Sequence, residues 1–227
     1  MRFRPHPAII DHEEIFRTME TGSVSIALIP AAVTTVIKNL LENGLINHGM
    51  TGHLGSDILV SAQPFDRVET GENEHARVNL FLYQLNPKGI SGYSRHQTGK
   101  PDDPKYRYVS EIEMFYIVTG YGAQDLHAEM LIGCALQSLH EAASLTGEQV
   151  RSILGAPSSP KAGRVVPPAQ NAVTASGAAE MIKSLRIVPF MLDPDNLLSV
   201  WSSQQAPYRP SITYQATVFL AEPSNEK

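Results

Sequence analysis

Few residues of this 227-residue chain stand at the spacings that enzymes use. The Gly-Tyr-Gly at 120–122 lacks the third glycine of a dinucleotide-binding loop, and the glycines around Ser91 miss the nucleophile-elbow pattern by one position. Ser158 and Lys161 match a Ser-x-x-Lys string, but they lie in a proline-rich stretch, whereas a nucleophilic serine needs a rigid helix start to aim it. The sequence therefore predicts no catalytic site.

The histidines and the single cysteine do not indicate a metal centre. His48, His53 and His75 lie in predicted polar loops, and no two histidines have the i, i+4 spacing that orients two imidazoles on one helix face. Cys134 lies on an apolar helix stripe without a nearby cation, which predicts a buried, unreactive thiol. We therefore expect no metal, no other cofactor and no enzymatic activity. A small hydrolase that uses a loop histidine is the remaining enzymatic alternative.

The polar residues that most suggest a partner lie in the loop predicted at 88–106. Basic and tyrosine side chains alternate there, a composition that suits contact with an acidic protein surface and equally suits a solvated loop. The candidate contact residues of this basic loop are Tyr93, Arg95, Lys100, Lys105 and Arg107. The acidic stretch 66–74, with Asp66, Glu69 and Glu72, could contact this basic loop in a neighbouring subunit. Opposite charges on two subunits guide their association and fix their relative position.

Composition excludes several classes of protein. With 18 basic and 23 acidic residues the formal net charge is −5, which argues against general nucleic-acid binding. No apolar run reaches the roughly 20 residues that span a bilayer. Prolines and an acidic run near the N-terminus are incompatible with a signal-peptide core. We expect a chain made in the cytoplasm that neither binds nucleic acid nor inserts into a membrane.

The chain reads as one domain with additions. We expect an N-terminal extension at 1–23, a single domain at 24–222 and a C-terminal tail at 223–227. The stretch 155–180 is rich in Pro, Ala and Ser, which predicts a flexible insertion. A domain of this size buries roughly 70% of the surface of its unfolded chain, so it needs no disulfide.

Apolar periodicity predicts three helices before the insertion. The first begins near Pro30 and ends at Gly44 as a left-handed stop, before a glycine-rich loop. Asp125 is placed to cap the second, whose apolar stripe is Leu126, Met130, Leu131, Cys134, Ala135 and Leu139. The Thr146–Gln149 segment has capping-box spacing and opens the third.

Alternation predicts five strands, at 57–63, 78–85, 108–119, 182–190 and 211–221. The second is nearly all apolar, which predicts burial on both faces, and Asn86 with Pro87 ends it. In the third, two glutamates are expected to face water at one end. The order of elements predicts an α+β fold with a mainly antiparallel sheet and helices packed on one face.

The C-terminal part joins a helix directly to the last strand. Asp193 is predicted to cap a helix that starts at Pro194, and Trp201 is predicted to anchor it in the core. We further expect the last strand, 211–221, or its neighbour to lie near a sheet edge that can accept a strand from another subunit.

Two motifs carry a family resemblance. One is the strand NLFLYQLN at 79–86, and the other is the Leu-x-x-x-Trp…Pro-Tyr-Arg-x-Ser-x-x-Tyr closure that begins at Leu197. The motif residues, to which we assign a structural role, are Asn79, Tyr83, Asn86, Trp201, Pro207, Tyr208, Ser211 and Tyr214, and Arg209 is a further candidate contact residue. Over about 24–222 the chain resembles the cap, or tail-terminator, family of extracellular contractile injection systems, which are phage-tail-like particles.

The resemblance implies a tail-terminator-like fold and a structural role. Such a protein forms a six-fold ring on the end of the tube and sheath distal to the baseplate, stops polymerisation and anchors the sheath end. The implied partners are further copies of the chain, the sheath protein and the inner tube protein. A non-enzymatic adaptor, either a baseplate or a cargo-loading component of the same particle, is the alternative. The resemblance leaves open whether the particle is cytoplasmic, membrane-anchored or released.

Overall fold

A computed structural model describes residues 26–71, 74–91, 108–155 and 168–221. In these ranges a six-stranded sheet has the order β1-β2-β3-β6-β5-β4. Its strands are β1 (Leu59–Ser61), β2 (Arg77–Ser91), β3 (Tyr108–Tyr121), β4 (Ser144–Thr146), β5 (Ile182–Pro189) and β6 (Ser211–Leu220). Only β1 and β2 pair in parallel. The predicted α+β class with a mainly antiparallel sheet is confirmed.

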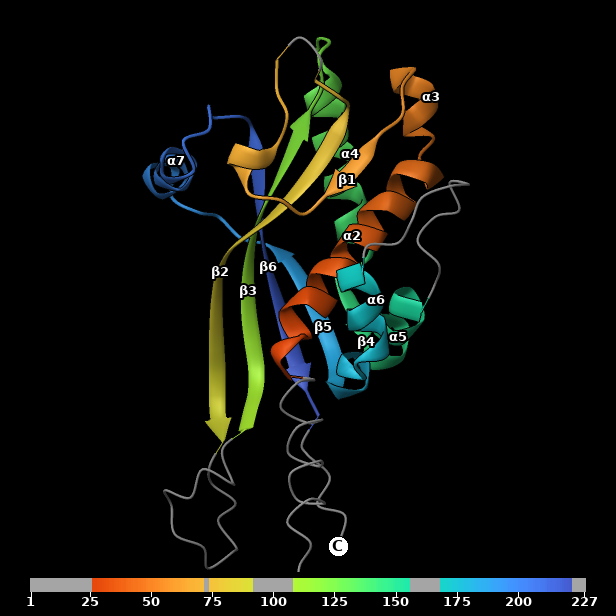
Figure 1. Ribbon diagram of the computed structural model, residues 1–227, viewed down its shortest axis with the longest axis vertical. Coiled ribbons are helices and arrows are strands. Elements are labelled where there is room, and N and C mark those ends of the chain that lie inside the picture. Colours follow the sequence, from red (N-terminus) through yellow and green to blue (C-terminus); the bar gives the residue numbers. More distant parts are fainter. Residues whose placement is uncertain (1–25, 72–73, 92–107, 156–167, 222–227) are drawn as a thin grey trace, which may run out of the picture.

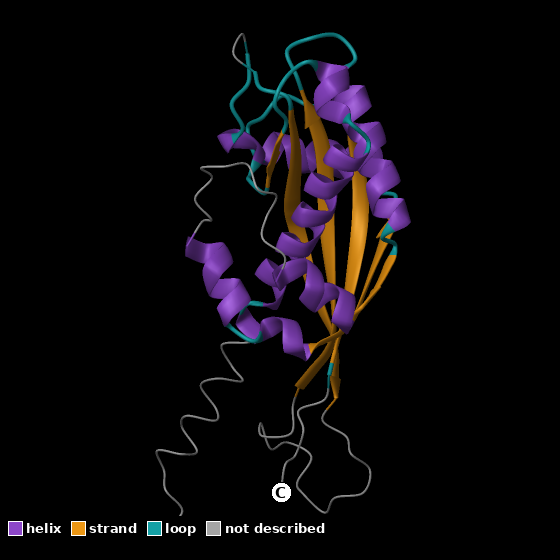
Figure 2. Ribbon diagram, turned by 90° about the vertical axis from the view of Figure 1, so that its right-hand side faces the viewer, coloured by secondary structure: helices purple, strands orange, loops and turns teal. Residues whose placement is uncertain are grey.

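Most helices cover one face of this sheet, as Figures 1 and 2 show. They are α2 (Ile29–Asn47), α3 (Met50–Leu54), α4 (His127–Glu141), α5 (Gly147–Gly155) and α6 (Pro168–Ala175). The last helix, α7 (Pro194–Ser203), lies on the opposite side (Figure 1). The prediction that the helices pack on one face of the sheet therefore holds for α2 to α6. Helix α7 instead covers part of the second face.

The main core lies between the sheet and the larger helix layer. From α2 it takes the predicted stripe, in which Val33, Val36, Ile37 and Leu41 are buried and Leu40 is partly buried. The opposing side chains alternate along the central strands, as the period of a half-buried strand requires. One polar contact crosses this layer, where the hydroxyls of Thr34 and Tyr116 lie 2.9 Å apart.

The predicted end of the first helix at Gly44 is wrong. Helix α2 continues to Asn47, and Gly44 is buried within it. A Cβ at position 44 would lie 1.9 Å from Ser138 Oγ on α4, so glycine is required here for close helix packing rather than for a left-handed stop. The predicted loop that follows contains the short helix α3, which two left-handed glycines flank, Gly49 (φ 64°) and Gly55 (φ 63°).

The second helix starts differently from the prediction. Leu126, with φ 67°, is the residue before α4, and no side chain caps this helix, so Asp125 does not have the predicted role. The predicted stripe is confirmed at Leu131, Cys134, Ala135 and Leu139, which are buried together with Ser138. Leu126 and Met130, at the start of the stripe, are exposed instead.

The third helix begins with the predicted capping box. Gln149 N donates to Thr146 Oγ1 over 3.3 Å, and Thr146 N donates to Gln149 Oε1 over 2.8 Å. The predicted flexible insertion is partly helical, because its second half forms α6 and a 3₁₀ turn, Ala178–Met181. Val173 and Ala178 are buried against the main core, which fixes this part of the chain.

Strand β2 runs through Asn86 and Pro87, which do not end it. Burial on both faces holds only for its first part, since Gln84 and Leu85 are exposed. On the side away from β3, β1 pairs only with residues 77–79 of β2, so beyond Asn79 this edge has no strand partner among the described residues. Proline is compatible with an edge strand because the missing N–H can face outward.

Strand β6 is central, so the last strand itself does not lie at an edge, whereas its neighbour β5 lies next to the short outermost strand β4. Strand β6 pairs with β3 over Ser211–Phe219 and with β5 over Tyr214–Leu220. Its backbone is therefore engaged on both sides, whereas β2 beyond Asn79 and β5 beyond Arg186 each lack a strand partner on one side among the described residues.

Glu113 on β3 is 8% exposed and does not face water as predicted. Lys88 Nζ donates to its carboxylate, as do Asn86 Nδ2 over 3.1 Å and Gln215 Nε2 over 2.9 Å. The hydrogen bond from Lys88 is the main cause that lowers the pKa of Glu113, against the opposing effect of burial.

Candidate docking site beside the closing helix

Helix α7 starts as predicted. Asp193 Oδ1 accepts a hydrogen bond from Asp195 N over 3.0 Å, and Pro194 occupies the first helical position. Trp201, 2% exposed, is the buried residue of this helix, whereas Leu198 is exposed. The helix ends at Ser203, and Gln205, with a left-handed φ of 52°, lies two residues beyond it.

Trp201 organises a small aromatic cluster on the second face of the sheet. Its ring stacks on Phe65 with 3.8 Å between centroids and 6° between planes, and Phe81 packs against Phe65 at 4.7 Å. The buried members of the aromatic cluster are Phe65, Val68, Ile117, Tyr121 and Trp201. Burial of an aromatic side chain of this size stabilises a fold by several kcal/mol, roughly 3–5 when judged by truncation to alanine.

A buried ion pair closes one side of this cluster. Arg209 contacts Glu74 in a bidentate manner, with Nη1 to Oε1 at 2.9 Å and Nη2 to Oε2 at 2.6 Å. The Glu74 side chain is 4% exposed, and its Oε1 also accepts from Gly122 N over 2.7 Å. The guanidinium carbon lies 5.0 Å from the centre of the Tyr121 ring. We call this arrangement the Glu74–Arg209 clamp, because it joins the turn before β2, the end of β3 and the start of β6.

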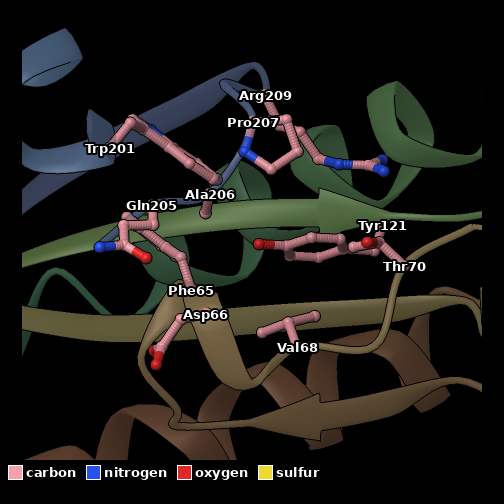
Figure 3. A pocket seen from close by; sticks show the side chains of 10 residues that line it. All are labelled: Phe65, Asp66, Val68, Thr70, Tyr121, Trp201, Gln205, Ala206, Pro207 and Arg209. Carbon is pink, nitrogen blue, oxygen red and sulfur yellow. The ribbon is translucent and has the colours of Figure 1, made fainter. Parts of the chain in front are cut away.

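The aromatic cluster and the clamp surround a pocket of about 140 Å³ (Figure 3). The residues that line it are Phe65, Asp66, Val68, Thr70, Tyr121, Trp201, Gln205, Ala206, Pro207 and Arg209. In Figure 3 the Tyr121 hydroxyl points toward the middle of the pocket, on the side of Phe65 and Ala206. Its lining thus combines apolar and aromatic side chains with polar ones in equal number.

Two of the polar atoms in this lining have no hydrogen-bond partner. Tyr121 is 1% exposed and its hydroxyl is unpaired, and the same holds for Nε1 of Trp201. Burial raises the pKa of Tyr121 to about 12, against the opposing charge of Arg209, so the hydroxyl keeps its proton at neutral pH. The indole N–H is only a donor.

The acidic stretch is divided between the interior and the surface. Glu74 is bound by Arg209 of the same chain, whereas Asp66 and Glu69 are exposed beside the pocket. Glu72 lies outside the described residues, and so do Tyr93, Arg95, Lys100, Lys105 and Arg107 of the basic loop. The structure thus brings one candidate contact residue, Arg209, into an internal pair and leaves the basic loop untested.

Residues of the first motif hold β2 to its surroundings. Asn79 is fully buried, and its side chain binds Ser61 Oγ at 2.7 Å, Gln63 N at 3.1 Å and Gln63 O at 2.9 Å. Tyr83 lies 6.2 Å from Phe115 between ring centres, and burial raises the pKa of its hydroxyl. Asn86 is one of the donors to Glu113.

Residues of the second motif surround the pocket or support it. Pro207 lines it, and Tyr208, 52% exposed, meets Trp201 edge-on at 6.0 Å. Ser211 Oγ donates to the carbonyl of Arg209 over 2.9 Å, whereas Tyr214 lies in the main core. Sequence reasoning missed Phe65, Glu74 and Tyr121 as members of this site, because each reaches the motif only through tertiary contacts.

The described residues hold no cluster of His, Cys, Asp or Glu side chains that could bind a metal ion. Burial raises the pKa of the Cys134 thiol, which disfavours its reactive thiolate form. Among the described helices, none combines the length and the apolar character needed to cross a bilayer. The pocket is therefore the candidate site that the described geometry offers, and its chemistry is that of binding.

Comparison with known proteins gives one family. The model of the Pvc16 N-terminal domain matches residues 32–227. Among solved structures, the chain is similar to the sheath/tube terminator of PVC, an extracellular contractile injection system, in the extended state, with 17% identity, a TM-score of 0.39, and 80% of this chain and 57% of that chain covered. The anti-feeding prophage cap (the AFP tube-terminating cap) has 15% identity, a TM-score of 0.37, and corresponding coverages of 80% and 56%.

The chain thus spans little more than half the length of these two solved chains. No curated protein matches it in sequence. The family match, which extends over most of the chain, confirms the family predicted from the two sequence motifs. The chain belongs to the Pvc16 N-terminal domain family.

Proposed function

We propose that this chain is the structural terminator of a contractile injection system, forming a ring on the distal end of tube and sheath. The family match over residues 32–227 is the observation that carries the proposal. In this role the ring stops polymerisation and holds the sheath end when the sheath contracts. Its partners are the sheath protein, the inner tube protein and further copies of the same chain.

Physical features of the described residues are consistent with such a role. The open edge of β2 offers unpaired backbone groups, which is the requirement for strand addition by a neighbouring subunit. The pocket beside α7 and the helix layer lie on opposite sides of the sheet (Figure 1). A closed ring uses two different surface patches of each subunit, so distinct opposite faces suit a heterologous contact.

The deciding experiment compares particles assembled with and without the chain. Sheath and tube proteins are co-expressed with the wild-type chain or with an empty control, and particle lengths are measured by electron microscopy. We expect a defined length with a cap density at one end in the first case, and long tubes of variable length in the second. Equal length distributions would contradict a terminator role and favour an adaptor of the same particle.

The ring itself is tested by mass. Light scattering behind a sizing column is expected to give six times the 24.8 kDa of one chain, for the free protein or for the protein released from capped tubes. A stable assembly of another number of copies in both preparations would contradict the six-fold arrangement without affecting the length measurement.

A further inference from the structure

We draw no further inference here: the strongest candidate, the exposed apolar patch of Leu126 and Met130 at the start of α4, carries none, because nothing in the described part of the structure shows what covers it.

Discussion

At the scale of single residues, Gly44 shows how the distance between two helices is set by one missing side chain. We predict that Gly44→Ala destabilises the protein by about 1–3 kcal/mol, because its Cβ would overlap Ser138 Oγ and force α2 and α4 apart. Ser138→Gly in the same chain removes the overlapping atoms and should recover part of the loss. Urea unfolding of the three variants measures both effects.

Gly133→Ala on α4 is the matched control. Gly133 is an exposed helical residue, and no atom lies within 4 Å of the Cβ that alanine would add. Alanine there should stabilise the protein, by up to about 1 kcal/mol, through helix propensity alone. If Gly44→Ala left the free energy of unfolding unchanged or raised it, as expected for Gly133→Ala, the close packing of Gly44 against Ser138 would be unimportant for stability.

Buried tyrosines predict sensitivity to alkali. Burial raises the pKa of Tyr214 and that of Tyr121 to about 12, above the ordinary value of about 10 in the unfolded chain. A group whose pKa is raised on folding stabilises the fold below the unfolded pKa, and this contribution is lost as the pH rises further. The urea midpoint should therefore be level up to about pH 9 and fall between about pH 10 and 12.

Tyr214→Phe tests this prediction, because it removes one such hydroxyl, which has no partner. The variant should be as stable as the wild type at pH 7, or more stable by up to about 1 kcal/mol. Its midpoint should decline less between pH 10 and 12. A parallel decline in both proteins would mean that groups other than Tyr214 cause the alkaline unfolding.

At this scale, short-range features could be predicted and long-range ones could not. The cap at Asp193 and the capping box at Thr146 depend on residues two or three positions away, so the sequence contains the whole interaction. Glu74 and Arg209, which pair with each other, are 135 positions apart in the sequence. Nothing in the local sequence distinguishes Glu74 from the other acidic residues of the stretch 66–74. Glu113 was misplaced for the same reason, since its partners come from two other strands.

At the scale of elements, the Glu74–Arg209 clamp joins three segments that lie just beyond the paired ends of β2, β3 and β6. We predict that Arg209→Ala costs about 2–5 kcal/mol of stability, because the nearly buried Glu74 carboxylate loses its partner. Arg209→Lys keeps the charge but loses the bidentate geometry, so the cost should be intermediate. Denaturant unfolding followed by circular dichroism gives these values.

An exposed ion pair is the control for the clamp. Arg151 and Glu180 lie 3.7 Å apart with both side chains largely in solvent, and Arg151→Ala should cost less than about 1 kcal/mol. Losses of similar size in Arg209→Ala and Arg151→Ala would contradict the structural role of the clamp.

The elements and most of their buried faces were predictable, whereas several of their exact ends were not. Periodicity located α2, β3, β5 and β6, because each has a long buried stripe. It failed for β2 at Asn86 and Pro87, where proline is a strong stop in a helix or a central strand but is tolerated on an open edge. It also failed for α6, whose eight residues bury mainly Val173 and so carry little periodic signal.

At the scale of the whole molecule, two clusters of unequal size share one sheet. β3 connects them: Met114, Tyr116 and Val118 face the main core, whereas Ile117 and Tyr121 face the aromatic cluster. β6 contributes Tyr214, Ala216 and Val218 to the main core on the same central part of the sheet. Because the strands between the clusters are common to both, neither cluster can open without exposing backbone of the other.

This sharing predicts a single cooperative transition. The emission of Trp201 reports the aromatic cluster, and far-ultraviolet circular dichroism reports mainly the helices of the larger layer. We expect the two signals to give the same urea midpoint and the same slope, as two-state unfolding requires. An earlier change in emission would mean that α7 and the pocket detach while the sheet persists. In that case the pocket beside α7 would be lost whenever α7 detaches, independently of the rest of the sheet. Its apparent affinity for a partner would then be scaled by the fraction of chains in which α7 is attached.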